Sequence, residues 1–202
     1  MPTEIQIIEK PDWISWEEIK KCLYDAHSVN RQKGINMRRY LWSAEDIRNY
    51  IGPNGVMLVA LDGKKVIGTA AISEKYDNTW YIKGRYAYLC FGCVLPQYSG
   101  QGIFKKMEHK REEIALLQGY DVLLADTHIK NKVRLHIAKH NGYHKIHCFR
   151  GRNSDHYSVI IAKWTKGCPY PPIYLNIRFY YSWLYINIVT ILRRIKRYFF
   201  TY

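Results

Sequence analysis

The spacing of apolar and polar residues predicts helices in the first part of the chain. Residues 12–27 and 43–52 carry apolar side chains at helical intervals. Asp12 and Ser43 are candidate N-caps for these two helices. Asp46 follows Ser43 by three residues, which is the position of the second member of a capping box. The chain is therefore expected to open with two capped helices.

Apolar runs farther along the chain predict strands. They occupy residues 56–62, 65–73, 86–94, 121–127, 143–149 and 157–164. Asp62-Gly63 lies between the first two runs and favours a tight hairpin. Further helices are expected from about Gly102 to Gln118 and from about Asn131 to His140. The strand–helix–strand unit within this order indicates an α/β fold with a parallel pair of strands.

Composition and charge narrow the class of protein. The chain has 202 residues, 48% of them hydrophobic, which is enough apolar material for one domain with a real core. Its 31 Lys and Arg against 17 Asp and Glu give a net charge of +14. Six of the basic residues and none of the acidic ones lie in 165–202, so the remainder carries +8. Such a balance favours anionic partners, namely nucleic acid, anionic lipid or a phosphorylated cofactor.

The last part of the chain differs from the rest, and prolines separate the two. We expect a domain over 1–164 and a basic, aromatic-rich amphipathic appendage over 165–202. On a helix, one apolar side would gather Ile177, Tyr181, Leu184, Ile188, Ile191, Leu192 and Ile195. The appendage can dock on the domain or on a second subunit, or it can contact an anionic membrane surface. Nucleic acid is the weaker alternative, because the charge lies on an apolar helix rather than on a polar stripe.

A short glycine loop joins the third strand to the next helix. Gly100 and Gly102 stand one residue apart in the segment Leu95–Met107. Glycines let backbone N–H groups approach a pyrophosphate closely, and the helix N-terminus adds positive charge there. The alternative is an ordinary turn, since a lone Gly-x-Gly is common in loops.

These residues resemble the GNAT superfamily of acyl-CoA-dependent N-acetyltransferases. The resemblance covers about 55–164 and rests on Gln97-x-x-Gly100-x-Gly102. It is supported by Val94-x-Pro96, by Ile103, by Asn131 and by Gly142-Tyr143. The resemblance implies a mixed, mostly antiparallel sheet with a splayed central parallel pair, flanked by helices.

The resemblance also implies acetyl-CoA, or another acyl-CoA, as co-substrate, and no metal. The implied cofactor-binding residues are Cys93, Val94, Gln97, Ser99, Gly100, Gln101, Gly102, Ile103, Phe104 and Asn131. Asn131 has a second interpretation as a helix N-cap. The implied reaction is direct attack of an unidentified amine on the thioester, without a covalent enzyme intermediate. A small-molecule amine is the expected acceptor, and a protein amine remains an alternative. The alternative is a non-catalytic CoA-binding or partner-binding module of the same fold.

The chain departs from the family's pattern at two catalytic positions. The segment from Arg85 to Pro96 has no Asp or Glu, and the position seven residues after Asn131 is Ala138 instead of Tyr. The candidates that remain for acid–base work are His128, Asp126, Tyr88 and Tyr143. His128 is the leading candidate base, with an exposed loop histidine as the alternative interpretation.

The cysteines and the remaining histidines indicate structure rather than metal binding. Cys90 and Cys93 form a C-x-x-C without the second pair that a zinc ribbon needs. Cysteines three apart on a regular strand are expected on opposite faces, so they are assigned to core or pocket lining. His136 and His140 share a helix face, which we interpret as polar and solvated. An odd cysteine count and a polar start favour a reducing, cytoplasmic location, with peripheral contact at the inner membrane face as an extension.

Overall fold

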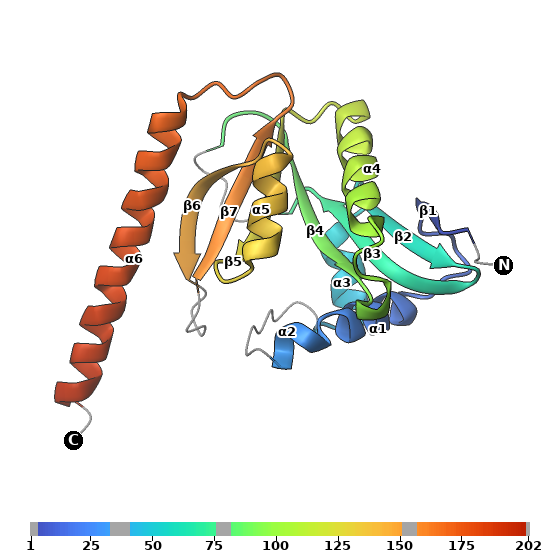
Figure 1. Cartoon of the computed structure of the whole chain (residues 1–202), viewed down its shortest axis with the longest axis horizontal. Coiled ribbons are helices and arrows are strands. Elements are labelled where there is room, and N and C mark those ends of the chain that lie inside the picture. Colours follow the sequence, from blue (N-terminus) through green and yellow to red (C-terminus); the bar gives the residue numbers. More distant parts are fainter. Residues whose placement is uncertain (1–3, 33–40, 76–81, 151–156, 201–202) are drawn as a thin grey trace. The chain divides into compact units, whose positions relative to one another are not determined.

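A computed structural model describes residues 4–32, 41–75, 82–150 and 157–200 and shows an α/β fold (Figure 1). Seven strands form one sheet in the order β1-β2-β3-β4-β5-β7-β6. The sheet is mostly antiparallel, and β4 and β5 are its parallel pair, as predicted for the fold class. The chain divides within β5 into two compact units, Met1–Leu123 and Leu124–Tyr202.

Most strands lie where the apolar runs placed them. The predicted bounds are confirmed for β2 (Val56–Asp62), β3 (Lys65–Ser73), β4 (Tyr86–Val94) and β7 (Tyr157–Trp164). The bounds of β5 (Val122–His128) and β6 (His144–Arg150) differ from the prediction by one residue. An unpredicted strand, β1 (Gln6–Glu9), pairs with β2 at the edge of the sheet. Its four residues are too few for a clear period-two pattern.

The α-helices in the described part of the first unit include α1 (Trp16–Ala26), α2 (Ser28–Gln32), α3 (Ala44–Ile51) and α4 (Ile103–Leu117). The prediction of Asp12 as an N-cap is wrong, because Ser15 caps α1 in a capping box with Glu18. The box of Ser43 with Asp46 at the start of α3 is confirmed. α2 was not predicted as a separate helix.

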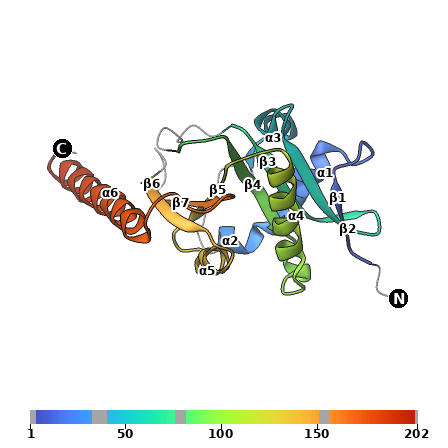
Figure 2. The ribbon, with the colours of Figure 1, turned by 90° about the horizontal axis from the view of Figure 1, so that it is seen from above.

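The core of the first unit has helices on both faces of its strands (Figure 1, Figure 2). α4 covers one face, where Met107 lies beside Gly68 of β3. α1 and α3 cover the other face with Ile19, Leu23 and Ile47, all buried. The helix α4 is thereby fixed against β3 and β4, and its N-terminus lies directly after the glycine loop.

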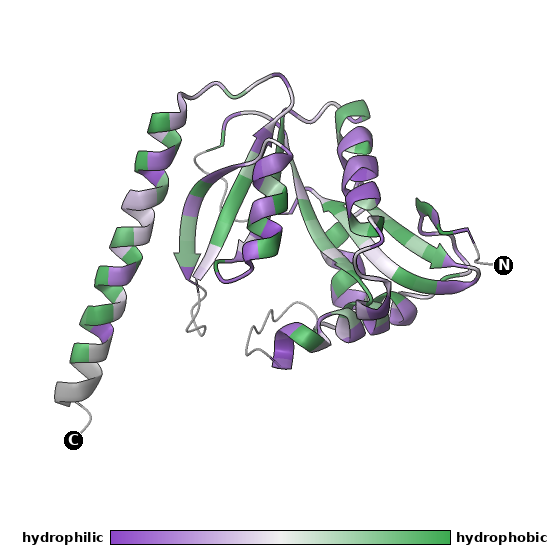
Figure 3. Cartoon of the chain, in the orientation of Figure 1, coloured by the Kyte–Doolittle hydropathy of each residue, from purple (hydrophilic) through white to green (hydrophobic). Residues whose placement is uncertain are grey.

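The second unit contains β6, β7, α5 (Lys132–His140) and a long final helix, α6 (Pro172–Phe200). α6 packs along β6 and buries Leu175 and Phe179. Its Ser182 hydroxyl accepts a hydrogen bond of 2.9 Å from the backbone N–H of Cys148 in β6. Apolar residues recur along the coloured part of α6 (Figure 3), and the predicted apolar stripe from Ile177 to Ile195 is exposed. The face that meets β6 is therefore a different one.

Candidate functional site

The loop after β4 is held by the hairpin of β2 and β3. The strand passes through Leu95, whose N–H donates to Ile67, into a 3-10 turn at Pro96–Tyr98. The Tyr98 hydroxyl donates to Asp62 at the hairpin over 2.7 Å. This bond raises the pKa of Tyr98 above its ordinary value, so the hydroxyl stays protonated. The start of the loop is thus fixed from two sides.

The two loop glycines adopt left-handed backbone conformations. φ is +81° at Gly100 and +74° at Gly102, values that side-chain-bearing residues rarely adopt. A Cβ at either position would meet nothing within 4 Å, so the space above the loop is open. Gly102 is the N-cap of α4 and supplies no side-chain cap. The N–H groups of the first turn of α4 are therefore available to an anion.

The other predicted loop residues divide between ligand-accessible and core positions. Gln97, Ser99 and Gln101 are exposed. Ile103 is buried and anchors α4, while Phe104 is half-buried. No acidic residue lies in the first turn of α4. In the first unit, the predicted cofactor residues therefore lie at the end of β4 and at the start of α4, which has no side-chain cap.

A β-bulge interrupts β4 just before this loop. In the register, Thr69 of β3 faces Cys93 and Ala71 faces Cys90, so Phe91 and Gly92 share the space of one residue. Phe91 has φ of +50°, a conformation rare for such a side chain. The buried Thr69 hydroxyl donates to the carbonyl of Phe91 over 2.7 Å. The bulge was not predicted, although Gly92 inside a strand is a signal for one.

The bulge overturns the expectation for the two cysteines of β4. Residues that pair across antiparallel strands share a face, and Thr69 and Ala71 lie two apart on β3. Cys90 and Cys93 therefore point to the same face, and both are buried. A hydrogen bond to Cys93, together with burial, raises the pKa of Cys22 in α1. Cys90 and Cys93 therefore belong to the core between α1 and β4.

A buried ion pair supports the bulge from the side of α4. Arg111 and Glu108 form a salt bridge, and both side chains are almost fully buried. Arg111 Nη1 donates to the carbonyl of Cys90 over 3.0 Å and to that of Ala71 over 3.3 Å. Arg111 therefore satisfies carbonyl groups where the bulge disturbs the ladder. No sequence signal distinguished this arginine from the other basic residues of α4.

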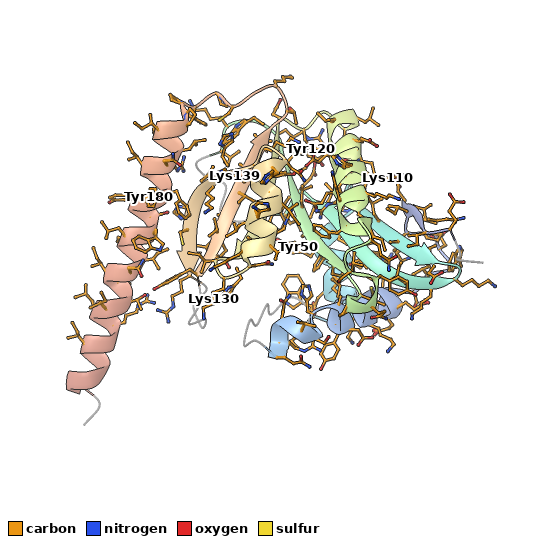
Figure 4. All side chains as sticks on the ribbon, viewed as in Figure 1. Tyr50, Lys110, Tyr120, Lys130, Lys139 and Tyr180 are labelled. Carbon is orange, nitrogen blue, oxygen red and sulfur yellow. The ribbon has the colours of Figure 1, made fainter. Side chains whose placement is uncertain are left out.

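Aromatic rings gather on the other side of the bulge. Tyr50 of α3 (labelled in Figure 4) packs edge-on against Phe91 and Tyr88, with centroids 5.9 and 6.2 Å apart. Trp42 contacts Tyr50 and Phe91 in the same way. Tyr88 is fully buried, whereas Trp42 and Tyr50 are half-buried. An apolar, aromatic surface therefore adjoins the irregular part of β4.

The remaining candidate residues belong to the second unit. His128 is buried at the end of β5, so the interpretation as an exposed loop residue is wrong. Its Nδ1 accepts a hydrogen bond of 3.0 Å from the N–H of Lys130, which places the proton of the neutral ring on Nε2. Asp126 is half-buried on the same strand, and Tyr143 is buried beyond α5. Asn131 caps α5 by accepting from the N–H of Arg134.

The histidines of α5 form a surface pair. The rings of His136 and His140 lie 4.2 Å apart, and both residues are exposed. Across the residues that the structure describes, no group of three or more His, Cys, Asp or Glu side chains could hold a metal ion.

Comparison with known proteins points to one family. The model of the acetyltransferase (GNAT) family matches residues 16–143 of this chain. A search of curated protein sequences finds no match.

Solved structures with the same fold belong to acetyltransferases. The ribosomal-protein-S18-alanine N-acetyltransferase of Escherichia coli superposes with a TM-score of 0.62 at 14% identity, covering 80% of this chain and 94% of its own. The PaiA N-acetyltransferase of Thermoplasma acidophilum, in complex with coenzyme A, superposes with a TM-score of 0.58 at 19% identity, covering 80% of this chain and 99% of its own. The NatC complex bound to Gag peptide and CoA superposes with a TM-score of 0.62 at 18% identity, covering 80% of this chain and 99% of the matched chain. At these identities the likeness shows the fold alone.

Proposed function

Because the chain belongs to the acetyltransferase (GNAT) family, we propose that it transfers an acetyl group from acetyl-CoA to the amine of a small-molecule acceptor. The observation that carries this proposal is the open glycine loop at the start of α4. Two left-handed glycines and an uncapped helix start suit a pyrophosphate, and no acidic residue lies in the first turn. Two of the solved structures of the same fold hold coenzyme A.

In this proposal, the segment from Gln97 to Phe104 binds the pyrophosphate of CoA. The backbone of Cys93 and Val94 at the end of β4 binds the pantetheine arm, as a sheet edge binds an extended chain. The bulge removes Phe91 and Gly92 from regular pairing with β3, so their N–H groups are candidates to polarise the thioester carbonyl. Asn131 is a further cofactor contact besides its capping role.

The chemical step needs a neutral amine. Its nitrogen forms a bond to the thioester carbon, the C–S bond breaks, and the CoA sulfur leaves as a thiol or thiolate. The amine proton passes to Asp126, Tyr88, Tyr143 or water. We assign His128 a different role, donation of a hydrogen bond from Nε2–H to the departing thiolate or to the carbonyl oxygen, with the proton staying on the ring, because Nδ1 already accepts from Lys130. This assignment replaces the expectation that His128 is the base.

The acceptor is proposed to meet the aromatic surface beside the bulge. Trp42 and Tyr50 are half-buried, so part of each ring is accessible, and both contact Phe91. Aromatic faces bind apolar groups and cations, so amines with an apolar or sugar-like body suit this surface.

The loop assignment is tested by Gly102→Asp with Gly119→Asp as matched control. Both glycines have φ near +75°, and a Cβ at either would meet nothing within 4 Å, so the two variants carry similar backbone strain. The new carboxylate at 102 would stand where the pyrophosphate binds, and that at 119 would stand beyond the opposite end of α4. We expect CoA affinity, measured by calorimetry, to fall more than about tenfold, or about 1.4 kcal/mol, only in Gly102→Asp. Equal affinity in the two folded variants would reject the loop as the CoA site.

The reaction itself is tested by thiol release from acetyl-CoA in the presence of an amine library. Release that depends on the amine supports transfer. Binding of CoA without release by any amine would favour a non-catalytic CoA-binding module, and longer acyl-CoAs in the same assay would measure the preference for chain length.

A further inference from the structure

We propose that the outer face of α6 binds the surface of a bilayer that contains anionic lipid. This outer face consists of eleven exposed apolar side chains on one side of α6. They are Ile173, Tyr174, Ile177, Tyr180, Tyr181, Leu184, Tyr185, Ile188, Ile191, Leu192 and Ile195. The inference is independent of the reaction proposed above.

The outer face is one continuous stripe. At 100° per residue its eleven members occupy roughly 140° of the helix circumference. From Ile173 to Ile195 the stripe runs for roughly 33 Å at 1.5 Å per residue. Its members are about half-exposed or more, and a patch of this size is unusual for a surface in contact with water alone.

The outer face is not the face that joins α6 to its own unit. Leu175, Phe179 and Ser182 are buried against β6, and they lie on the opposite side of the helix wheel. Farther along, Arg150 of β6 and Tyr157 of β7 donate hydrogen bonds to Thr190 on that inner side. Packing within the unit therefore leaves the apolar stripe uncovered along the helix.

A cationic, aromatic groove adjoins the outer face. It has a volume of about 430 Å³, and Tyr180 (labelled in Figure 4) and Trp183 of α6 form one wall. Lys132 of α5 and Lys145 of β6 line it too, and both are exposed. Lys145 Nζ lies 5.5 Å from the centroid of Phe179. Aromatic side chains beside two ammonium groups fit the boundary between acyl chains and lipid phosphates.

Charge favours lipid over a second copy of the chain as the occupant. Residues 165–202 contain six Lys and Arg and no Asp or Glu, so two copies of α6 would bring like charges together. A coiled-coil seam also needs only two apolar positions per heptad, with charged residues beside them. Here Tyr180, Tyr185 and Leu192 flank the seam, so the face is wider than a helix pair requires.

The helix would lie along the surface rather than cross the bilayer. None of the helices in the described part of the chain has the length and apolarity of a membrane span. An amphipathic helix with tyrosines and basic residues suits the interface, where apolar side chains enter the headgroup region. Each Lys or Arg near an anionic surface adds about 1 kcal/mol, or about fivefold in partitioning.

The test is co-sedimentation of the full chain with phosphatidylcholine vesicles, with and without phosphatidylglycerol. We expect binding only to the vesicles that contain phosphatidylglycerol, and we expect it to weaken as salt is raised. Leu184→Glu/Ile188→Glu should abolish binding, and Lys145→Glu should weaken it about fivefold or more. The matched control is Leu116→Glu/Leu117→Glu, which adds the same charges at exposed apolar positions of α4 and should bind as the wild type does.

Three results would overturn the proposal. One is failure of the wild type to bind anionic vesicles. Another is equal loss in both double variants, which would show an effect of net charge alone. The third is a lipid-free dimer by light scattering that Leu184→Glu/Ile188→Glu converts to monomer, which would make the outer face an interface between copies. Melting curves of both double variants show whether each is folded before binding is measured.

Discussion

The hydrogen bond from Lys130 N–H to His128 Nδ1 sets what that residue can do. A neutral imidazole has one lone pair, and here the lone pair on Nδ1 is already an acceptor. The ring can donate from Nε2 without changing its tautomer, but it cannot take up the amine proton there. The sequence suggested a base because it shows a histidine at this position, but it does not show which ring nitrogen carries the proton.

Two substitutions at His128 separate the donor role from the base role. His128→Ala should lower kcat by about 100- to 1,000-fold with CoA affinity nearly unchanged, the range typical of removing one hydrogen-bond donor to a developing negative charge. His128→Gln places an amide N–H near the position of Nε2, so a donor role predicts recovery of most of that loss. Steady-state kinetics and calorimetry on both variants provide the measurement. If Gln is as slow as Ala, His128 is not acting as a simple hydrogen-bond donor, and if Ala stays within about twofold of wild type the residue has no part in the step.

At the residue scale, the sequence predicted the positions of the loop glycines better than the conformation of β4. Gly100 and Gly102 were identified from their spacing, and their left-handed angles agree with the need for glycine. The φ of Phe91 was not predictable, because it is imposed by the pairing of β4 with β3 and the bonds from Thr69 and Arg111. Such contacts join residues about 20 positions or more apart, which a local pattern does not report.

At the scale of elements, the bulge of β4 depends on a helix that lies on one face of its sheet. Arg111 of α4 reaches the carbonyls of Ala71 and Cys90, and Glu108 balances its charge inside the core. A buried pair stabilises little by itself, but either partner left alone is an uncompensated buried charge. The pair is therefore expected to fix the form of β4 more than to raise overall stability.

A double-mutant cycle tests this interpretation. Arg111→Met should lower the free energy of unfolding by about 3 kcal/mol, because it leaves Glu108 buried without its cation. Adding Glu108→Leu should recover a good part of that loss, since both charges are then absent. Denaturant unfolding of the two single variants and the double variant gives the coupling. A double variant no more stable than Arg111→Met would show that the bonds to the bulge carbonyls, and not the charge balance, dominate.

The strands were predicted well because they are bounded by strong local signals. Asp62-Gly63 ended β2 and began β3, and Pro96 closed β4. The start of α1 was misplaced because Asp12 and Ser15 are both good caps, and only Ser15 has Glu18 three residues later to complete a box. β1 is defined by its pairing with β2 rather than by its own pattern.

At the scale of the whole molecule, the sequence predicted an apolar side of α6 but not whether that side packs against its unit or stays exposed. The stripe from Ile177 to Ile195 was identified correctly as one side of a helix, yet α6 meets β6 through Leu175, Phe179 and Ser182. Fewer apolar residues lie on the side of α6 that packs on β6 than on the exposed side. The hydrophobic periodicity of the sequence therefore identified the exposed side. A single helix thus carries two apolar surfaces, one packed inside its unit and one exposed.

These two surfaces can be separated by comparing truncation with substitution. Ending the chain after Gly167 should lower the melting temperature, because it exposes the strand face that Leu175 and Phe179 cover and removes the acceptor for the Cys148 N–H. Burial of two such side chains accounts for about 3 to 6 kcal/mol. Leu184→Glu/Ile188→Glu changes only exposed positions, so its melting temperature should stay close to that of the wild type. Calorimetric melting of the three proteins gives the comparison. A truncated chain as stable as the full one would mean that α6 contributes nothing to its unit. An unstable Leu184→Glu/Ile188→Glu variant would mean that the outer face is covered within the folded chain.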